Sequence, residues 1–278
     1  MGGSEAERRG AGAPVDAYLL ELAARSRAVF GERLVGVYVG GSLALGAYEQ
    51  GRSDLEVAVV VEGRLSSRDR RRCTPTSDAG VHRRSESEVL VAALRHESLP
   101  CPARGLELVV YSREAAASAA VDVDFELNLN TGRGMPFRAD FELDPAIGSH
   151  WFAIDRAILR ERGRAVAGPP AAEVFAEIPR SLLLPVVVES LRWHEGGDVA
   201  GDDSVLNACR ALRYARENIW SSKPAAGRWA LEHRPDRALV AAALAARAGG
   251  PAVDPERAAS FVAVVLEELR GYEPSFTS

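Results

Sequence analysis

Two short stretches of the chain carry polar side chains suited to chemistry on a phosphate. Gly41-Ser42 follow an apolar stretch, and backbone amides with a serine hydroxyl at such a turn can bind phosphate oxygens. Asp54 and Glu56 lie in the next apolar stretch, residues 54–61. Side chains two residues apart on a strand point to one face, about 6.5–7 Å apart. Since unpaired buried acids are costly, these two either lie at the solvent-exposed rim of the sheet or hold cations.

A further acid, Glu107, interrupts the apolar stretch 105–112. A lone Glu in such a strand is unusual unless it has a partner. If this strand lies beside the strand of Asp54, three carboxylates converge near the phosphate-binding turn. Mg²⁺ prefers oxygen ligands and joins carboxylates to substrate phosphates, so this arrangement indicates a site for a divalent metal and a nucleotide. The alternative, a Glu107 paired with an arginine within the sheet, stays open.

The elements that must position these residues follow from the hydrophobic pattern. Helices are predicted over residues 15–30 and 88–98, and strands over 34–40, 54–61, 105–112 and 123–130. The near-continuous apolar strands indicate a sheet covered by helices. Residues 1–14 are predicted to be a disordered lead-in, and the Arg-rich, aperiodic segment 62–86 a flexible insertion.

The pattern becomes helical from about residue 146. Helices are predicted over residues 151–163, 179–195, 203–220, 225–233, 236–248 and 255–271. The run Asp202-Asp203-Ser204 is expected to cap the start of the third of these, and Asp254-Pro255 to begin the last. The sequence therefore predicts an α/β domain over residues 15–145 and an α-helical bundle over residues 146–278.

Composition narrows the class of partner. With a net charge of -5 over 278 residues, nucleic acid is an unfavourable partner, and a cationic ligand is mildly favoured. No apolar run reaches the ~18 residues that span a bilayer, and the N-terminal residues lack an apolar signal segment. The three cysteines have no ligand-like spacing, which indicates a reducing compartment. We expect a cytoplasmic monomer that binds neither membrane nor nucleic acid.

The spacing of Gly41-Ser42, Asp54 and Glu56, with Glu107 as the third acid, resembles the nucleotidyltransferase fold shared with DNA polymerase beta. Within that superfamily the chain is most similar to the aminoglycoside adenylyltransferases that modify streptomycin and spectinomycin. Three C-terminal stretches support the resemblance in order and spacing: AVAGPPAAEVFAEIP (165–179), VLNACRAL (205–212), and Lys223 followed by WALEHRP (229–235). The resemblance implies an α+β fold, in which a nucleotidyltransferase domain with a mixed sheet precedes a helical drug-binding domain.

The resemblance also implies an activity, transfer of AMP from ATP to an antibiotic hydroxyl (streptomycin 3''-hydroxyl, spectinomycin 9-hydroxyl, or both), which confers resistance. Asp54 and Glu56 would bind two Mg²⁺ ions, with Glu107 also near the metal and acting as general base.

Two further sets of residues have roles implied by the same resemblance. Gly41 and Ser42 would hold the β- and γ-phosphates. Lys223, the only lysine among 34 basic residues, would neutralise phosphate charge. Asp202 and Asp203 would pair with the cationic acceptor.

The chain departs from the family pattern at several positions. Glu56 stands where aspartate is more usual, Gly40 where relatives often have histidine, and no tryptophan accompanies Asp202. Two other functions remain open: adenylylation of another small hydroxylated metabolite or of a protein, and a non-catalytic nucleotide sensor. Trp193, Trp220 and Trp229 are expected to be core anchors of the helical domain.

Overall fold

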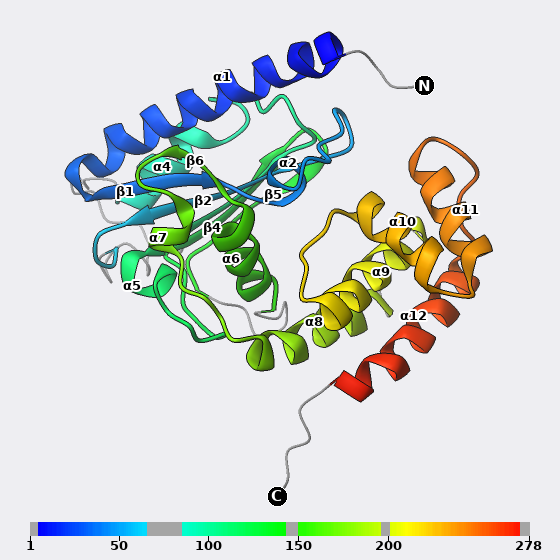
Figure 1. Cartoon of the computed structure of the whole chain (residues 1–278). Coiled ribbons are helices and arrows are strands. Elements are labelled where there is room, and N and C mark those ends of the chain that lie inside the picture. The colour runs from blue at the N-terminus through cyan, green and yellow to red at the C-terminus, as the bar shows by residue number, and fades with distance from the viewer. Residues whose placement is uncertain (1–4, 66–84, 143–149, 196–200, 273–278) are drawn as a thin grey trace, which may run out of the picture. The chain divides into compact units, whose positions relative to one another are not determined.

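The computed structural model describes residues 5–65, 85–142, 150–195 and 201–272 (Figure 1). The chain forms two compact units: residues 1–118, 123–148 and 155–177 make up the first, and residues 119–122, 149–154 and 178–278 the second. The boundary therefore differs from the predicted one at residues 145 and 146. The reason is that residues 164–167 add a strand to the sheet of the first unit.

The first unit is built on a six-stranded mixed sheet, so the predicted α+β class is confirmed. Its strand order is β5-β4-β3-β2-β1-β6; β2 and β3 are parallel, and the other neighbours are antiparallel. The strands are β1 (Leu34–Val39), β2 (Leu55–Val61), β3 (Leu106–Ser112), β4 (Leu127–Gly132), β5 (Met135–Asp140) and β6 (Arg164–Ala167). The sequence did not predict β5 and β6, because these edge strands have no buried residue and carry no apolar run.

Two helices, α1 (Glu5–Phe30) and α4 (Glu86–Leu94), cover one face of the sheet (Figure 1). Leu22 of α1 and Leu90 of α4 are fully buried against alternate strand residues, among them Leu55 and Val57. The disordered lead-in predicted over residues 1–14 is wrong for residues 5–14, which are helical. This stretch is rich in Ala, Glu and Arg, which favour helix enough to carry it through Pro14.

The helix α4 begins with a capping box at Ser85. The Ser85 hydroxyl accepts a hydrogen bond from the Glu88 amide at 3.1 Å, and the Ser85 amide donates to the Glu88 carboxylate at 2.9 Å. The predicted insertion 62–86 is therefore wrong at its end, where residues 85 and 86 start a helix. Residues 66–84 lie outside the described residues.

The opposite face of the sheet receives the side chains that alternate with this core. There Tyr38 of β1 packs edge-to-face on Phe175, with ring centroids 5.3 Å apart. The remaining helices with residues in the first unit are α2 (Gly41–Ala44), α5 (Arg113–Ala116), α6 (His150–Arg162) and α7 (Ala171–Val174), with a 3-10 turn at Gly31–Arg33. Because Leu55 and Val57 point to the α1 side, Glu56 points to this opposite face.

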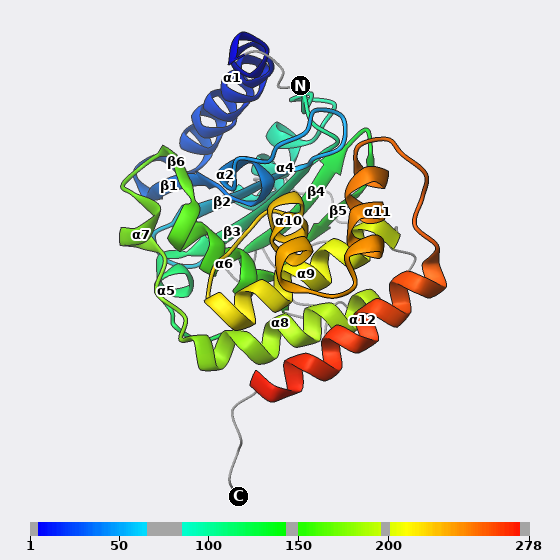
Figure 2. The same cartoon turned by 45° about the vertical axis from the view of Figure 1, so that its right-hand side comes forward.

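The second unit is helical, as predicted. Its helices are α8 (Arg180–Glu195), α9 (Gly201–Glu217), α10 (Lys223–His233), α11 (Arg237–Arg247) and α12 (Pro255–Leu269), followed by a 3-10 turn at Arg270–Tyr272. The helix α9 contacts each of the other four, and its apolar residues Val205, Cys209 and Leu212 are fully buried (Figure 2). The predicted start of the last helix is confirmed, since Asp254 accepts from the Arg257 amide at 3.0 Å.

Two predictions for the second unit need correction. Asp202 and Asp203 do not precede α9 as caps, because the helix already begins at Gly201 and places both acids in its first turn. In the first turn, both negative charges still interact favourably with the positive end of the helix dipole. Trp220 and Trp229 are buried as expected, but Trp193 is 49% exposed and packs edge-to-face on Trp151.

Both cysteines within the described residues lie in the interior. Cys101 and Cys209 are buried free thiols, and burial raises the pKa of Cys209 to about 12. Within the described residues, no helix combines the length and apolar character needed to cross a membrane.

Candidate active site

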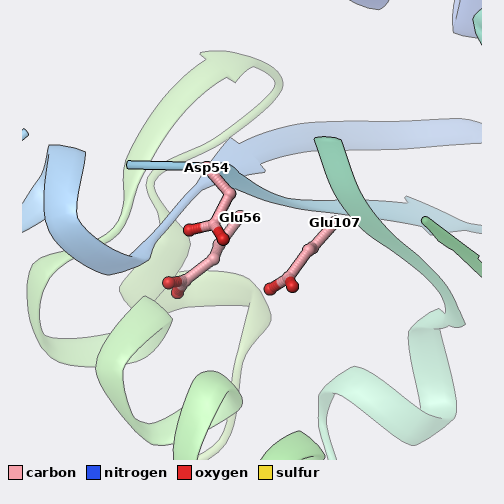
Figure 3. A group of neighbouring side chains, drawn as sticks. All are labelled: Asp54, Glu56 and Glu107. Atoms are coloured by element: carbon pink, nitrogen blue, oxygen red, sulfur yellow. The ribbon is translucent and has the colours of Figure 1, made fainter. Parts of the chain in front are cut away.

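The structure brings Asp54, Glu56 and Glu107 together on one face of the sheet (Figure 3). Asp54 directly precedes β2, and Glu56 is its second residue. Glu107 is the register partner of Glu56 across the parallel β2–β3 pair. One carboxylate oxygen from each acid lies within 4.8 Å of the others, and all three residues are partly buried. The convergence expected from adjacent strands is therefore observed.

Such a cluster is suited to a divalent cation. Three carboxylates this close repel one another unless positive charge lies among them. Hard oxygen donors from rigid strands are the ligands that Mg²⁺ takes, together with substrate phosphates and water. The longer side chain of Glu56 still reaches the cluster, so its departure from the usual aspartate leaves the three donors together.

The turn at Gly41 is shaped around the Glu56 carboxylate. Gly41 has φ +51°, in the left-handed region that favours glycine. A Cβ at this position would also overlap with the carboxyl group of Glu56. The Gly40 amide donates to the Glu56 carbonyl at 2.9 Å, which fastens the turn to β2. The Gly41-Ser42 turn therefore packs directly against the acidic cluster and is hydrogen-bonded to the strand that carries Glu56.

Ser42 is the second residue of the single-turn helix α2. Its Oγ is buried and finds no hydrogen-bond partner within the described part of the chain. A buried hydroxyl without a partner costs free energy, which a ligand oxygen at this position would offset. The buried hydroxyl is consistent with the phosphate contact predicted for Ser42, and that contact stays a prediction.

The sequence interpretation missed Arg104. Its Nη2 lies 2.6 Å from Oδ2 of Asp54, in an ion pair whose side chains are 45% and 20% exposed. The sequence pointed to an arginine partner only for Glu107, and the pair of Arg104 with Asp54 was not predicted. No sequence signal marks it, because Arg104 is one of many arginines and lies before β3 rather than on it.

The second unit holds a cluster of opposite character around Asp203. Lys223 Nζ lies 3.0 Å and Arg247 Nη1 3.2 Å from the same oxygen, Oδ1 of Asp203. Lys223 is the first residue of α10, whose N-cap Ser222 accepts from the Ala225 amide at 3.3 Å. Burial lowers the pKa of Lys223, and the charge of Asp203 opposes that shift. The contact of Arg247, at the end of α11, was not predicted, because Arg247 lies 44 residues after Asp203 in the sequence.

A sequence comparison matches part of the second half of the chain to a known protein family. Residues 173–269 match the family model described as aminoglycoside adenylyltransferase, C-terminal domain. The predicted resemblance to that family is thereby confirmed for this part of the chain.

A solved structure has the same fold over nearly the whole chain. It is described as spectinomycin adenyltransferase AAD(9) from Enterococcus faecialis with ATP and spectinomycin. The similarity has a TM-score of 0.67 at 15% sequence identity and covers 91% of this chain and 98% of that chain. No curated protein sequence matches the chain.

Proposed function

We propose that this protein is an ATP- and Mg²⁺-dependent adenylyltransferase. It transfers AMP to a hydroxyl of an aminoglycoside or aminocyclitol antibiotic, of the streptomycin or spectinomycin type, and so confers resistance. The observation that carries the proposal is the convergence of three carboxylates within 4.8 Å on the sheet. The match of residues 173–269 to the adenylyltransferase C-terminal domain supports the acceptor class.

Asp54 and Glu56 would hold magnesium, as two ions, with Glu107 beside them. Their oxygen donors and partial burial fit that metal. When bound, such ions supply positive charge that stabilises the attacking and leaving oxygens of an in-line displacement. The role of Gly41 is to let the backbone turn lie directly on the Glu56 carboxylate, which fixes this acid in place.

Glu107 is the proposed general base. It accepts the proton of the acceptor hydroxyl while that oxygen forms a bond to the α-phosphorus of ATP. The bond from the α-phosphorus to the bridging oxygen breaks, and pyrophosphate leaves with the bonding electrons. A base must lie within hydrogen-bond reach of the proton, and the position of Glu107 beside Glu56 across the β2–β3 pair supports this assignment.

The phosphates need donors and positive charge. Ser42 Oγ, buried and without a partner in the described chain, and the Gly41 amide would bind the β- and γ-phosphates. Lys223 would neutralise charge on the triphosphate and the departing pyrophosphate. Its position on Asp203 keeps the ammonium group in one place.

Asp202 and Asp203 remain the proposed contacts to the cationic acceptor. Acids pair strongly with guanidinium and ammonium groups when partly shielded from water, and Asp202 is only 8% exposed. Oδ1 of Asp203 also holds Lys223 and Arg247. We prefer Asp202 as the acceptor contact because it is the more shielded from water of the two.

A drug susceptibility panel tests this function. A susceptible host expressing the chain should grow at higher concentrations of streptomycin, spectinomycin or both, and the same host expressing Glu107→Gln should not. Equal resistance of the two strains would contradict an enzymatic origin. No resistance to any aminoglycoside, with the protein expressed and folded, would remove the antibiotic as acceptor.

A further inference from the structure

We propose that Arg104 is the resident counter-charge of the acidic cluster: its guanidinium holds Asp54 when no cation is bound and competes with the metal for that carboxylate. Arg104 would thereby set the metal affinity of the site. The inference rests on the proposed function in one respect, the assignment of Asp54, Glu56 and Glu107 as the metal site.

The ion pair itself is well formed. The 2.6 Å separation of Arg104 Nη2 and Asp54 Oδ2 is that of a charge-assisted hydrogen bond. The Asp54 carboxylate is also within 4.8 Å of the carboxylates of Glu56 and Glu107. Arg104 therefore offsets one of three negative charges and occupies an oxygen that a metal would use.

The backbone holds both partners of this pair at the same place. The Arg104 amide donates to the Ser53 carbonyl at 3.0 Å, directly before Asp54. Two residues after Ser53, the Leu55 amide donates to the carbonyl of Gly105, the residue after Arg104, at 2.9 Å. These two hydrogen bonds lie on either side of Asp54. They join the segments that lead into β2 and β3, from which the carboxylate and the guanidinium extend.

The turn between β4 and β5 fixes the stem of the arginine. The Gly134 amide donates to the Arg104 carbonyl at 2.9 Å. A Cβ at Gly134 would overlap with Cγ of Arg104, and a Cβ at Gly132 would lie 2.7 Å from its carbonyl oxygen. Glycines at these two positions let the turn pack directly on Arg104, which limits the directions its side chain can take.

The direction of the effect follows from charge. A cation that binds Asp54 through Oδ2 must displace the guanidinium; if it binds another oxygen, it is repelled by the arginine nearby. Both cases lower metal affinity, so removal of the Arg104 charge should raise it. If Arg104 only supported Asp54 structurally, its removal would instead lower the metal affinity, because Asp54 would lose that support.

Titration with Mn²⁺, without nucleotide or antibiotic, tests the inference through the electron paramagnetic resonance signal of the free ion. Arg104→Gln should lower the Mn²⁺ Kd about three- to tenfold, the size expected for one half-exposed charge beside a divalent ion. Arg104→Met, which keeps an apolar stem against Gly134, should lower it similarly. Arg104→Lys, which keeps the charge, should stay within about twofold of the unmodified protein.

Arg113→Gln is the matched control. Arg113 follows β3 and pairs with Glu62 at the other end of that strand, so this variant loses the same charge away from the cluster. Its Mn²⁺ Kd should not change. An unchanged or higher Kd in both Arg104→Gln and Arg104→Met would overturn the inference, as would an equal fall in Arg113→Gln.

The result is separable from the proposed function. Asp54→Asn should lose most Mn²⁺ binding, and a protein that binds no Mn²⁺ at the cluster would overturn the inference directly. Failure of AMP transfer to every antibiotic, with the Kd falling in the Arg104 variants, would remove the proposed function and leave this inference standing.

Discussion

The two units gather charge in opposite ways. On the sheet of the first unit, three carboxylates lie within 4.8 Å of one another, and one guanidinium pairs with them. In the helical unit, two cations, Lys223 and Arg247, share one oxygen of Asp203. Acids are thus grouped on the sheet, and cations are grouped in the helical unit. Under the proposed function, the acids would bind the metal and Lys223 would bind the phosphates of ATP.

The two regions also differ in what fixes them. The acids arise from adjacent strands in register, where the backbone leaves little freedom. The cations arise from the start of α10 and the end of α11, and reach Asp203 through long side chains. The comparison predicts large effects for changes on the sheet and smaller, ligand-specific effects for changes in the helical unit.

The largest effect is expected for Glu107→Gln, which keeps the shape and removes the base. The kcat for AMP transfer should fall about 10²–10⁴-fold, the usual contribution of general base catalysis, while ATP still binds. Glu97→Gln, at an exposed glutamate of the same unit, is the control and should leave kcat unchanged. Undiminished turnover in Glu107→Gln would show that another group takes the proton.

Lys223→Ala should act on ATP use. Loss of a charged hydrogen bond to phosphate costs about 1.5–3 kcal/mol, so kcat/KM for ATP should fall about 10–100-fold. Arg228→Ala, at an exposed position on the same helix, should have no such effect. If the ATP parameters of Lys223→Ala match those of the unmodified protein, the positive cluster has no role in phosphate binding.

Gly41→Ala tests the link between the turn and the acids. The new methyl group would overlap with the Glu56 carboxylate at a φ of +51°, so we expect a loss of about 1–2 kcal/mol in stability and weaker Mn²⁺ binding. Gly46→Ala shares the strained backbone, with φ +67°, but nothing lies within 4 Å of its Cβ. It should lose stability without changing Mn²⁺ affinity. Equal Mn²⁺ affinities in the two variants would contradict the proposed role of Gly41.

The smallest effects distinguish the two neighbouring acids of α9. Asp202→Asn should raise the KM for the antibiotic severalfold, about 1 kcal/mol for one partly shielded charge pair, and leave the KM for ATP unchanged. Asp203→Asn should raise the KM for ATP as well, because it releases Lys223 and Arg247. A change in the ATP KM of Asp202→Asn alone would reverse these assignments.

Much of the acidic region could be predicted from sequence. Strand periodicity places Asp54 and Glu56 on one face, and an acid inside an apolar strand marks Glu107. What periodicity does not supply is strand order, and the parallel pairing of β2 with β3 is what brings Glu107 to Glu56. Arg104 could not be predicted, because the direction of its side chain depends on packing against Gly134, a contact across the sheet.

The remaining discrepancies have local causes. The edge strands β5 and β6 lack an apolar run because none of their residues is buried. The early start of α1 comes from favourable helix propensity before Pro14. In the helical unit, helices were found from their 3.6-residue pattern. The pairing of Arg247 with Asp203 was hidden, since a side-chain contact between two helices leaves no periodic signal.

The central claim is that AMP is transferred to an antibiotic hydroxyl, and intact-mass analysis of the acceptor tests it most directly. Streptomycin, spectinomycin and a protein mixture would each be incubated with the protein, ATP and Mg²⁺. The account predicts the gain of one AMP on at least one antibiotic, absent with Glu107→Gln or without Mg²⁺. No AMP on either antibiotic, with AMP on a protein or with ATP bound but not consumed, would contradict it.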